Sequence, residues 1–449
     1  MTQRQAELIE LLHKEVKPAL GCTEPIAVAL AVAKAVETLD TNCPHKDSEG
    51  PKDRKELAAV LDITVEVSKN ILKNGMGVGI PGTGMVGLHI ASALGAVCGK
   101  SEYGLEVLHD LCKESIEDAR GLVERNQVKV TLANTDKKLY IKAILTTPCG
   151  HKSEVVIEDD HDNIVKTCLD GHILESAESS ASSAKAAETD HKGTLDYHLT
   201  VRDIFDFANE VAYDDIKFIL ECRDMNYTLA KEGLLGDYGL KVGKTIGGVQ
   251  NKEVFGEDFL SYAMAMTAAA SDARMAGCTL PAMSNSGSGN QGITVTVPVI
   301  SYALKYGIND EMLARALVLS NLIAIHIKGY LGKLSALCGC VVASTGSSCG
   351  IAFLRGGSYE TMTYCIKNMI GNITGMVCDG AKVGCAMKVA SGVSSAIQSA
   401  VLAMNGICIS SNDGIIEEGI EKTIQNLGKL GSLGMQSADN MILDIMVCK

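Results

Sequence analysis

The stretch DEMLARALVLSNLIAIHIK, residues 310–328, decides the broad class of fold. Its apolar residues recur at helical spacing and then fill nearly every position, which is typical of a helix buried on most sides. A membrane-spanning helix needs about 20 nearly unbroken apolar residues. This stretch instead contains Arg315, Asn321, His326 and Lys328. We therefore predict a core helix of a cytoplasmic protein that does not enter a membrane.

The rest of the chain divides by its periodicity. Helical spacing of apolar residues covers residues 3–39 and returns after residue 200. Between them, short segments alternate apolar and polar residues in the manner of strands. The predicted strands are 60–68, 126–134, 138–147 and 153–159, with helices at 87–97 and 104–126. The pattern predicts an α+β fold that is mainly helical.

The predicted domains follow from this division. Residues 1–40 and 195–449 are expected to form a helical catalytic domain, with residues 58–170 inserted in it as a smaller α/β module. Residues 171–194 are rich in Ser and Ala without apolar periodicity, so we expect a linker or exposed loop there.

Composition and charge exclude some classes of function. The 449-residue chain has 54 acidic and 41 basic residues, a formal net charge of −13. No stripe of Lys and Arg stands out, so we predict no nucleic-acid partner. The 16 cysteines follow no secretory signal, and thiols in the cytoplasm stay reduced. Half of them are expected to be small buried side chains.

Three glycines resemble a nucleotide-binding loop. Gly82, Gly84 and Gly87 have the dinucleotide-binding spacing, and Glu106 follows at about the distance of a ribose-binding acid. The preceding residues, 74–81, are broken by Gly and closed by Pro, so they make a poor first strand. A tight turn packed against a helix explains the same glycines, and we favour that interpretation.

A cysteine precedes the second predicted helix in the segment GCTEPIAVALAVAKAV, residues 21–36. Pro25 favours the first helical turn, so Thr23 or Glu24 is the expected cap. Cys22 then lies just ahead of the helix N-terminus, where unpaired N–H groups and the helix dipole stabilise a thiolate. The alternative is a cysteine with no such role.

A polar loop lies between two apolar segments at residues 278–292. Glycine lets successive N–H groups point into one concavity, and Ser and Asn add donors, which suits an anion such as a carboxylate. The predicted binding residues are Ser284, Asn285, Ser286, Gly287, Ser288, Gly289 and Asn290. An ordinary Ser/Gly loop is the alternative.

The remaining candidates are cysteines on glycine-rich segments. Cys338, Cys378 and Cys385 lack the paired short spacing of a zinc site. Three thiolates on separate loops suit an iron–sulfur cube in which one iron has no protein ligand. An open position of that kind is what a Lewis-acid catalyst requires. Such loose spacing is unspecific by itself.

Taken together, these motifs resemble the L-cysteine desulfidase family, which is similar to the catalytic chain of iron–sulfur L-serine dehydratases. The resemblance runs in order over nearly the whole chain. The segments that carry it are GCTEPIAVALA (21–31), KNGMGVGIPGTGMVGL (73–88), SDARMAG (271–277), MSNSGSGNQG (283–292), GKLSALCGC (332–340) and GMVCDGAKVGCAMK (375–388).

The resemblance implies a carbon–sulfur lyase that converts L-cysteine to sulfide, pyruvate and ammonia. It implies a [4Fe-4S] cluster held by Cys338, Cys378 and Cys385, with Cys22 as the base that removes the Cα proton. Cys340 is an alternative ligand to Cys338, and Cys448 is either a tail that reaches the cluster or a frayed terminus. We expect a small amino-acid substrate, no membrane partner and a homo-oligomer.

Two other functions stay open. L-Serine dehydration could use the same scaffold, because one carboxylate-binding loop serves both amino acids. A non-catalytic iron–sulfur sensor is the other possibility, with the α/β module as an effector-binding or dimer-forming insert.

Overall fold

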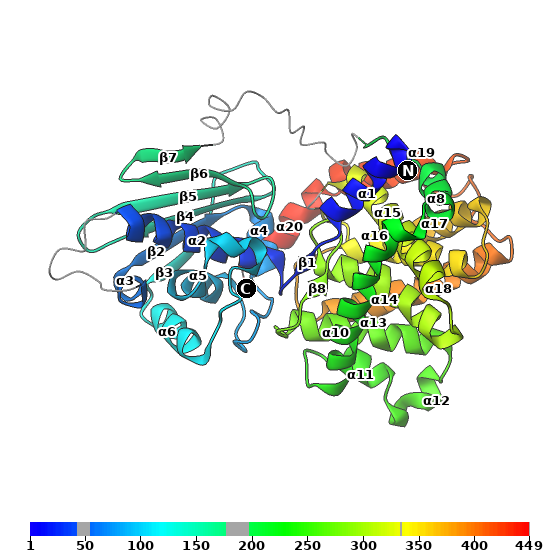
Figure 1. Ribbon diagram of the computed structural model, residues 1–449, viewed down its shortest axis with the longest axis horizontal. Coiled ribbons are helices and arrows are strands. Elements are labelled where there is room, and N and C mark those ends of the chain that lie inside the picture. Colours follow the sequence, from blue (N-terminus) through cyan, green and yellow to red (C-terminus); the bar gives the residue numbers. More distant parts are fainter. Residues whose placement is uncertain (43–53, 177–196, 333–334, 449) are drawn as a thin grey trace. The chain divides into compact units, whose positions relative to one another are not determined.

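The computed structural model describes residues 1–42, 54–176, 197–332 and 335–448 (Figure 1). Its internal contacts divide the chain into two compact units. The helical unit comprises Met1–Ala19, Lys192–Asp379 and Val383–Lys449, and the α/β unit comprises Leu20–His191 and Gly380–Lys382. With 62% helix and one mixed six-stranded sheet, the structure confirms the predicted α+β, mainly helical fold.

The helical unit begins at the N-terminus and resumes after residue 197. Its elements are α1 (Gln3–Glu15), β1 (Pro18–Ala19), α8 (Val201–Glu210), α9 (Tyr213–Ile216), η3 (Lys217–Leu220), α10 (Glu221–Leu235), α11 (Val242–Ile246), η4 (Val249–Asn251), α12 (Lys252–Phe255), α13 (Phe259–Met275), β8 (Ala282–Met283), α14 (Gly289–Tyr306), α15 (Asp310–Leu331), α16 (Gly339–Leu354), α17 (Tyr359–Ile373), α18 (Cys385–Met404), α19 (Ile420–Lys429), η5 (Leu430–Gly434) and α20 (Gln436–Val447).

Helix α15 is the core helix that its sequence predicts. Among the residues that the structure describes, it is the one helix long and apolar enough to span a membrane, but 83% of its most apolar window is buried in the unit. It packs against α14, α16 and α19. Its Asn321 side chain donates to the Leu317 carbonyl at 2.8 Å and accepts from Asn285 at 2.9 Å, so this buried amide is satisfied.

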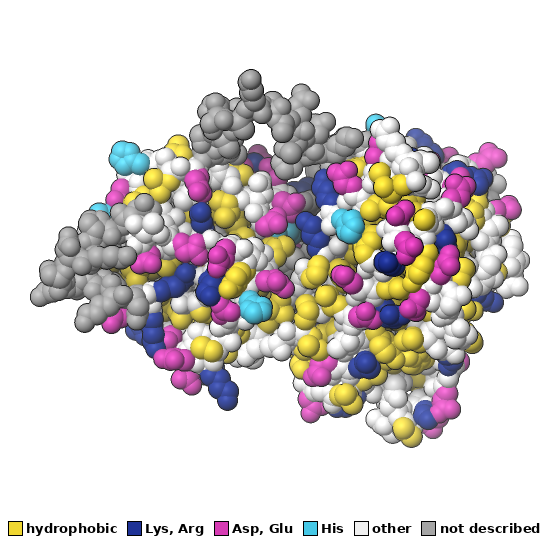
Figure 2. All heavy atoms as spheres, in the orientation of Figure 1, with side chains coloured by type: hydrophobic (Ala, Val, Ile, Leu, Met, Phe, Trp, Pro, Cys, Tyr) yellow, Lys and Arg dark blue, Asp and Glu magenta, His cyan; other side chains and the backbone are white. Residues whose placement is uncertain are grey.

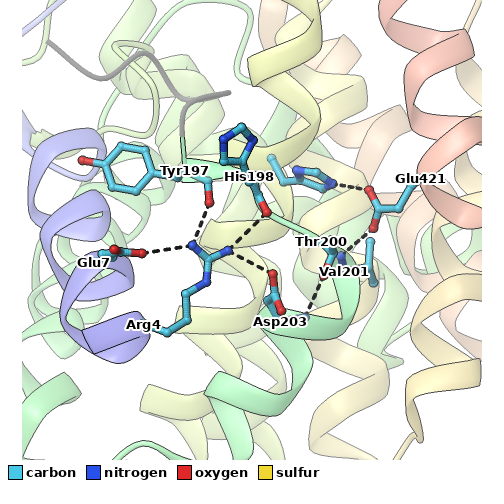
Figure 3. A network of polar contacts seen from close by, with 9 residues as sticks. Arg4, Glu7, Tyr197, His198, Thr200, Val201, Asp203 and Glu421 are labelled. Carbon is cyan, nitrogen blue, oxygen red and sulfur yellow. Dashed lines mark hydrogen bonds and ion pairs between the residues drawn. The ribbon is translucent and has the colours of Figure 1, made fainter. Parts of the chain in front are cut away.

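A polar network fastens α15 to elements from both ends of the chain (Figure 3). His326 of α15 lies with Nε2 2.7 Å from Glu421 Oε2 of α19. The other oxygen of Glu421 accepts the Val201 N–H at 2.7 Å, at the start of α8. Arg4 of α1 pairs with Asp203 of α8 at 2.9 Å. Helix α8 is therefore held by polar contacts from α1 and from α19.

The α/β unit is built on a single sheet. Its strands lie in the order β3-β2-β4-β5-β6-β7, and only the β2–β3 pair is parallel. Helices α2 and α5 pack against one face of the sheet (Figure 1). Its elements are α2 (Thr23–Asn42), α3 (Arg54–Val60), β2 (Asp62–Val67), α4 (Lys69–Gly75), α5 (Leu88–Val97), η1 (Ser101–Glu106), α6 (Lys113–Glu124), β3 (Val128–Leu132), β4 (Tyr140–Thr146), β5 (Lys152–Glu158), β6 (Ile164–Leu169) and β7 (His172–Ser176).

The structure corrects the predicted domain boundary at residue 40. Helix α2 belongs to the α/β unit, where it packs on α5, β4 and β5. The approach is close, since a Cβ on Gly95 of α5 would lie 2.4 Å from the Ala29 carbonyl oxygen. Because α2 is apolar on nearly every side, its sequence does not reveal which core it joins. The predicted linker 171–194 begins with strand β7, and its residues 177–194 lie outside the described residues.

The surface of each unit carries mixed charge. Figure 2 shows acidic and basic side chains interspersed on the visible face. In the helical unit, four large apolar side chains between the end of α10 and α12 are half or more exposed: Leu235, Leu240, Val249 and Val254. Exposed apolar side chains of this kind suit contact with another chain. Assembly of identical chains stays a prediction.

Candidate functional site

Two short backbone segments bring Cys338 and Cys378 onto the same face of a strand pair. Leu337 and Val377 form an antiparallel bridge. The Cys338 N–H donates to the Met376 carbonyl at 3.0 Å, and the Cys378 N–H donates to the Ala336 carbonyl at 2.6 Å. Side chains alternate between the faces of paired strands, so both residues next to the bridge point to the face opposite Leu337 and Val377.

Two of the three predicted cluster ligands lie at helix N-termini. Cys338 directly precedes α16 as its N-cap, and Cys385 is the first residue of α18. All three thiols are partly exposed. Burial raises the pKa of Cys338 well above its usual range, and the neighbouring thiolates of Cys340, Cys378 and Cys385 raise it further. Contacts of Lys388, near the start of α18, place Cys385 in the same region: its carbonyl accepts from Cys340, and its ammonium donates to the carbonyl of Val377, next to Cys378. The helix ends in this region favour anions.

The side chain of Cys340 packs between helices α16 and α18. Its Sγ donates to the Lys388 carbonyl at 3.1 Å, and a Cβ on Gly392 would lie 2.5 Å from that sulfur. The residue is buried, and burial raises the pKa of its thiol to about 11 despite the hydrogen bond from Ser344. Cys340 thus fills the space between α16 and α18, whereas Cys338 is partly exposed.

The cysteine group fits a cluster better than a single ion. Within the described ranges, no three Cys, His, Asp or Glu side chains are close enough to hold one metal ion. A cube makes a different demand, because each cysteine binds its own iron atom and the sulfurs lie farther apart. A cation stands beside the thiols: Lys388 donates to the Val377 carbonyl at 2.8 Å and pairs with Asp379. Nothing in the sequence pattern singles out Lys388.

The electrostatics of Lys388 support this fit. Burial lowers the pKa of its ammonium, but Asp379 and the thiolates of Cys338 and Cys378 outweigh that cost, so the net pKa is raised. A charged lysine therefore offsets some of the negative charge that thiolates bound to iron would gather.

The polar loop 284–290 is a tight turn at the N-terminus of α14. Ser286 and Gly287 have φ values of +49° and +77°, and Asn285 and Ser288 exchange backbone hydrogen bonds across them. Ser288 is the N-cap of α14, and its side chain accepts the Gln291 N–H. The reachable part of the loop therefore ends in a helix N-terminus, which suits a carboxylate.

The predicted loop residues divide into two kinds. Ser284 and Asn285 are buried and bond to the chain itself: Ser284 donates to the Lys17 carbonyl at 2.6 Å, and Asn285 to Asn321. Ser286, Gly287, Ser288 and Asn290 are at least partly exposed, and Gly289 is buried. Only the part from Ser286 onward can present groups to a ligand, while Ser284 and Asn285 hold the turn in place.

Arg274 is a site residue that the sequence did not single out. This residue of α13 is 3% exposed, and its Nη1 donates to Asn290 Oδ1 at 3.3 Å. A Cβ on Gly289 would lie 2.2 Å from its Nε, so only glycine leaves room for the guanidinium there. An arginine at the N-terminus of α14 adds a full positive charge to the donors of the helix end.

One buried amide connects the loop with Cys338. Gln291 is 1% exposed and donates to Asn285 at 2.7 Å, but no described residue donates a hydrogen bond to its Oε1. That oxygen lies 3.2 Å from the position of a Cβ on Gly339, the residue after Cys338. The N-termini of α14 and α16, and so the loop and the cysteine, are neighbours in the helical unit.

Cys22 lies in the α/β unit, directly before α2. The helix begins at Thr23, two residues earlier than predicted. The Cys22 thiol is 5% exposed and donates to Glu24 Oε2 at 2.9 Å. Gly21, with φ +69°, allows close contact with the glycine-rich segment, because a Cβ there would lie 2.7 Å from Pro81 Cγ.

The nucleotide-binding spacing lacks its structural context. Helix α4, not a strand, precedes Gly82 and Gly84, and α5 follows Gly87. A bridge between Gly79 and Val86 closes the segment into a turn. This arrangement agrees with the tight turn favoured above. Of the other sequence candidates, Cys448 is exposed just after α20, and Glu106 ends η1.

The helical unit gathers Cys338, Cys378 and Cys385, two of them at helix starts, and the α/β unit has Cys22 directly before a helix. Gathered thiols of this kind are typical of the class of proteins that hold an iron–sulfur cluster. Comparison with known proteins narrows the class. Residues 102–444 match the family described as serine dehydratase alpha chain. The chain belongs to this family, which indicates a serine dehydratase-like lyase of the iron–sulfur type. The match covers Cys338, Cys378 and Cys385 and begins after Cys22.

Similar proteins extend over the whole chain. It is 49% identical to a UPF0597 protein from Oleidesulfovibrio alaskensis, over 98% of this chain and 97% of that protein. It is 47% identical to a UPF0597 protein from Parabacteroides distasonis, over 99% and 98% of the two chains. One from Clostridium perfringens is 43% identical, over 98% of each chain. These names state no activity.

Proposed function

We propose that this protein is a [4Fe-4S]-dependent carbon–sulfur lyase that converts L-cysteine to sulfide, pyruvate and ammonia. The observation that carries the proposal is the gathering of Cys338, Cys378 and Cys385 in one region, next to a helix N-terminus with Arg274 at its side. Membership in the serine dehydratase family supports the reaction type, a β-elimination from a small amino acid.

The proposed ligands are Cys338, Cys378 and Cys385. Cys340 is not proposed, because its sulfur already bonds to the Lys388 carbonyl. Three protein ligands leave one iron of a cube open, and the bound cluster would supply a Lewis acid that stabilises the departing sulfur. Lys388 would offset part of the cluster's negative charge.

The chain itself would bind and deprotonate the substrate. The first turn of α14 and Arg274 would hold the α-carboxylate, which fixes the orientation of the amino acid. Cys22, as thiolate, would take the Cα proton. The C–S bond then breaks to give aminoacrylate, which hydrolyses to pyruvate and ammonia.

L-Serine is the second candidate substrate, because the matching family is described by that activity. Hydroxide would leave in place of sulfide, and the carboxylate site would serve both amino acids equally. The choice between the two substrates therefore depends on the leaving group alone.

Anaerobic reconstitution tests both candidates. We expect the reconstituted protein to carry about four iron and four sulfide per chain. It should release sulfide and pyruvate from L-cysteine faster than pyruvate from L-serine. Faster turnover of serine would establish the second candidate. A loaded cluster with turnover of neither amino acid would contradict the lyase proposal and favour a sensor.

Arg274→Lys and Arg274→Gln test the carboxylate site. Lysine keeps the charge but loses the planar fork, and glutamine loses both. We expect KM for the amino acid to rise by roughly tenfold for the first variant and a hundredfold for the second, since a charge-assisted hydrogen bond contributes about 1.5–3 kcal/mol. Unchanged KM in both variants would remove Arg274 from the site.

A further inference from the structure

The thiol of Cys22 donates a hydrogen bond to a buried carboxylate, that of Glu24. Glu24 is 7% exposed, and its Oε2 accepts the Cys22 thiol at 2.9 Å and the Thr23 hydroxyl at 3.3 Å. Its other oxygen accepts Asn74 Nδ2 at 2.9 Å, from α4. The Cys22 thiol and the Asn74 amide, which make the two shorter contacts, therefore orient one buried carboxylate so that it faces the sulfur.

The surroundings keep this carboxylate ionised. Burial raises the pKa of Glu24, but the charge of His161 and the hydrogen bonds from Cys22 and Asn74 outweigh burial, so the net pKa is lowered. His161 follows β5 and is 4% exposed, and its Nε2 has no hydrogen-bond partner among the described residues. Burying an imidazole nitrogen without a hydrogen-bond partner costs free energy, so we expect His161 to have a function at this carboxylate.

The other elements packed on this part of α2 add few charges. Helix α4 contributes Lys73, which is 2% exposed. Strands β4 and β5 face α2 mainly with apolar side chains, among them Ile141 and Val155. The contacts at Glu24 thus join one thiol and one amide to the carboxylate, and the charge of one imidazole acts on it.

We propose that Cys22 and Glu24 act together as one base, with Asn74 and His161 as positioning residues. This inference rests on the proposed lyase function. When substrate binds, the Cys22 S–H bond breaks and its proton passes to Glu24 Oε2. The thiolate takes the Cα proton, the electron pair of that bond forms the C=C bond, and the C–S pair leaves with sulfur. Glu24 then returns its proton to the departing sulfide, so both residues regain their starting states.

Glu24→Gln separates this pair from a lone thiol. Glutamine has the same shape and still accepts a hydrogen bond, but it cannot take the proton. In this variant Cys22 must lose its proton to solvent, so kcat/KM should rise about tenfold per pH unit below the ordinary thiol titration near 8.5. The unaltered protein should change little over the same range, because Glu24 stays ionised. At pH 7 we expect kcat about 100-fold lower, within the range of general base catalysis.

Thr23→Ala is the matched control. It removes the other side-chain hydrogen bond to Oε2 and leaves the proton acceptor in place. We expect a loss of kcat below about threefold and an unchanged pH profile, since a single neutral hydrogen bond contributes about 1 kcal/mol or less.

A second measurement needs neither cluster nor turnover. In apo protein, the rate at which a small thiol reagent modifies Cys22 is followed against pH by peptide mass spectrometry. Glu24→Gln removes an anion beside the thiol, so Cys22 should become reactive at lower pH while elimination becomes slower. A variant that merely misfolds would not combine these opposite changes.

The outcomes separate this inference from the proposed function. Wild-type kcat and pH profile in Glu24→Gln, or an unshifted reactivity of Cys22, would overturn the paired base while leaving the lyase intact. If the unaltered protein eliminates neither cysteine nor serine, the proposed function fails, and the reactivity measurement still reports whether Glu24 governs the thiol.

Discussion

At the scale of single residues, Asp272 shows how burial can make stability depend on pH. The side chain, on α13, is fully buried, and its Oδ2 accepts the Gly243 N–H at 2.9 Å, while Oδ1 has no hydrogen-bond partner within the part of the chain that the structure describes. Burial raises the pKa of Asp272 to about 6, although three backbone N–H groups lower it in part. The unfolded chain ionises this group near pH 4. The folded protein therefore loses stability as pH rises from about 4 to 6.

Asp272→Asn tests this effect. The shift corresponds to about 3 kcal/mol, since each pKa unit is worth about 1.4 kcal/mol. Asparagine can still accept the Gly243 N–H but does not ionise. Residue 272 should therefore add no pH dependence to the free energy of unfolding of the variant. We expect urea unfolding of the helical unit at pH 4.5 and 7 to differ less in the variant. Asp214→Asn, at an exposed carboxylate, is the control and should leave the pH dependence as it is.

Cys338 and Cys340 form a second pair for comparison, two residues apart. Cys338→Ala should lose the cluster, measured as iron content and visible absorbance after anaerobic reconstitution. Cys340→Ala should keep it and lose about 1–2 kcal/mol of stability, because a buried side chain between α16 and α18 is shortened. Loss of iron in the Cys340 variant alone would reverse the assignment of the ligand.

At the scale of elements, the Glu421 contacts connect α8, α15 and α19 (Figure 3). Glu421→Ala would leave His326 Nε2 and the Val201 N–H without their partner. Each unsatisfied buried group costs about 1–3 kcal/mol. We therefore expect the helical unit to lose about 2–4 kcal/mol in urea unfolding. Glu418→Ala, at an exposed position on the approach to the same helix, should change it by less than about 0.5 kcal/mol.

Local patterns predicted many of these elements, and the errors have local causes. Strands β2–β5 form where they are predicted, and in β2 and β4 buried residues alternate with more exposed ones. Strands β6 and β7 are not predicted by the sequence pattern. The signal for that hairpin was present in Asp170-Gly171, both of which have positive φ. The predicted helix 104–126 is interrupted: Gly104 leaves the helical region with φ +53°, and α6 starts only at Lys113. The prediction used the spacing of apolar residues alone, so it took no account of these turn residues.

The site was predictable only where it is local in sequence. Cys22 at a helix start and the loop 284–290 follow from turn and capping chemistry. Arg274 and Glu24 do not, because their roles come from contacts with Asn290 and with Asn74 and His161, far away along the chain. From the sequence alone, such an arginine or glutamate cannot be distinguished from an ordinary helix residue, because its neighbours in the fold are not known.

At the scale of the whole molecule, the two compact units divide the proposed chemistry. Cys338, Cys378 and Cys385 belong to the helical unit, and Cys22 with Glu24 to the α/β unit. Between Cys378 and Cys385, the short segment Gly380–Lys382 belongs to the α/β unit, where Lys382 forms a parallel bridge with Gly77.

This division predicts where cluster binding stabilises the protein. A ligand that binds only the folded state stabilises the unit that holds it, by about 3 kcal/mol at a hundredfold excess over Kd. Hydrogen exchange should therefore slow by roughly 10- to 100-fold in the first turns of α16 and α18 and in residues 376–378 after anaerobic reconstitution. The core strands β4 and β5 should exchange at the same rate with or without the cluster. Cys338→Ala should abolish the difference, and equal slowing in both units would show that the cluster is not held by the helical unit alone.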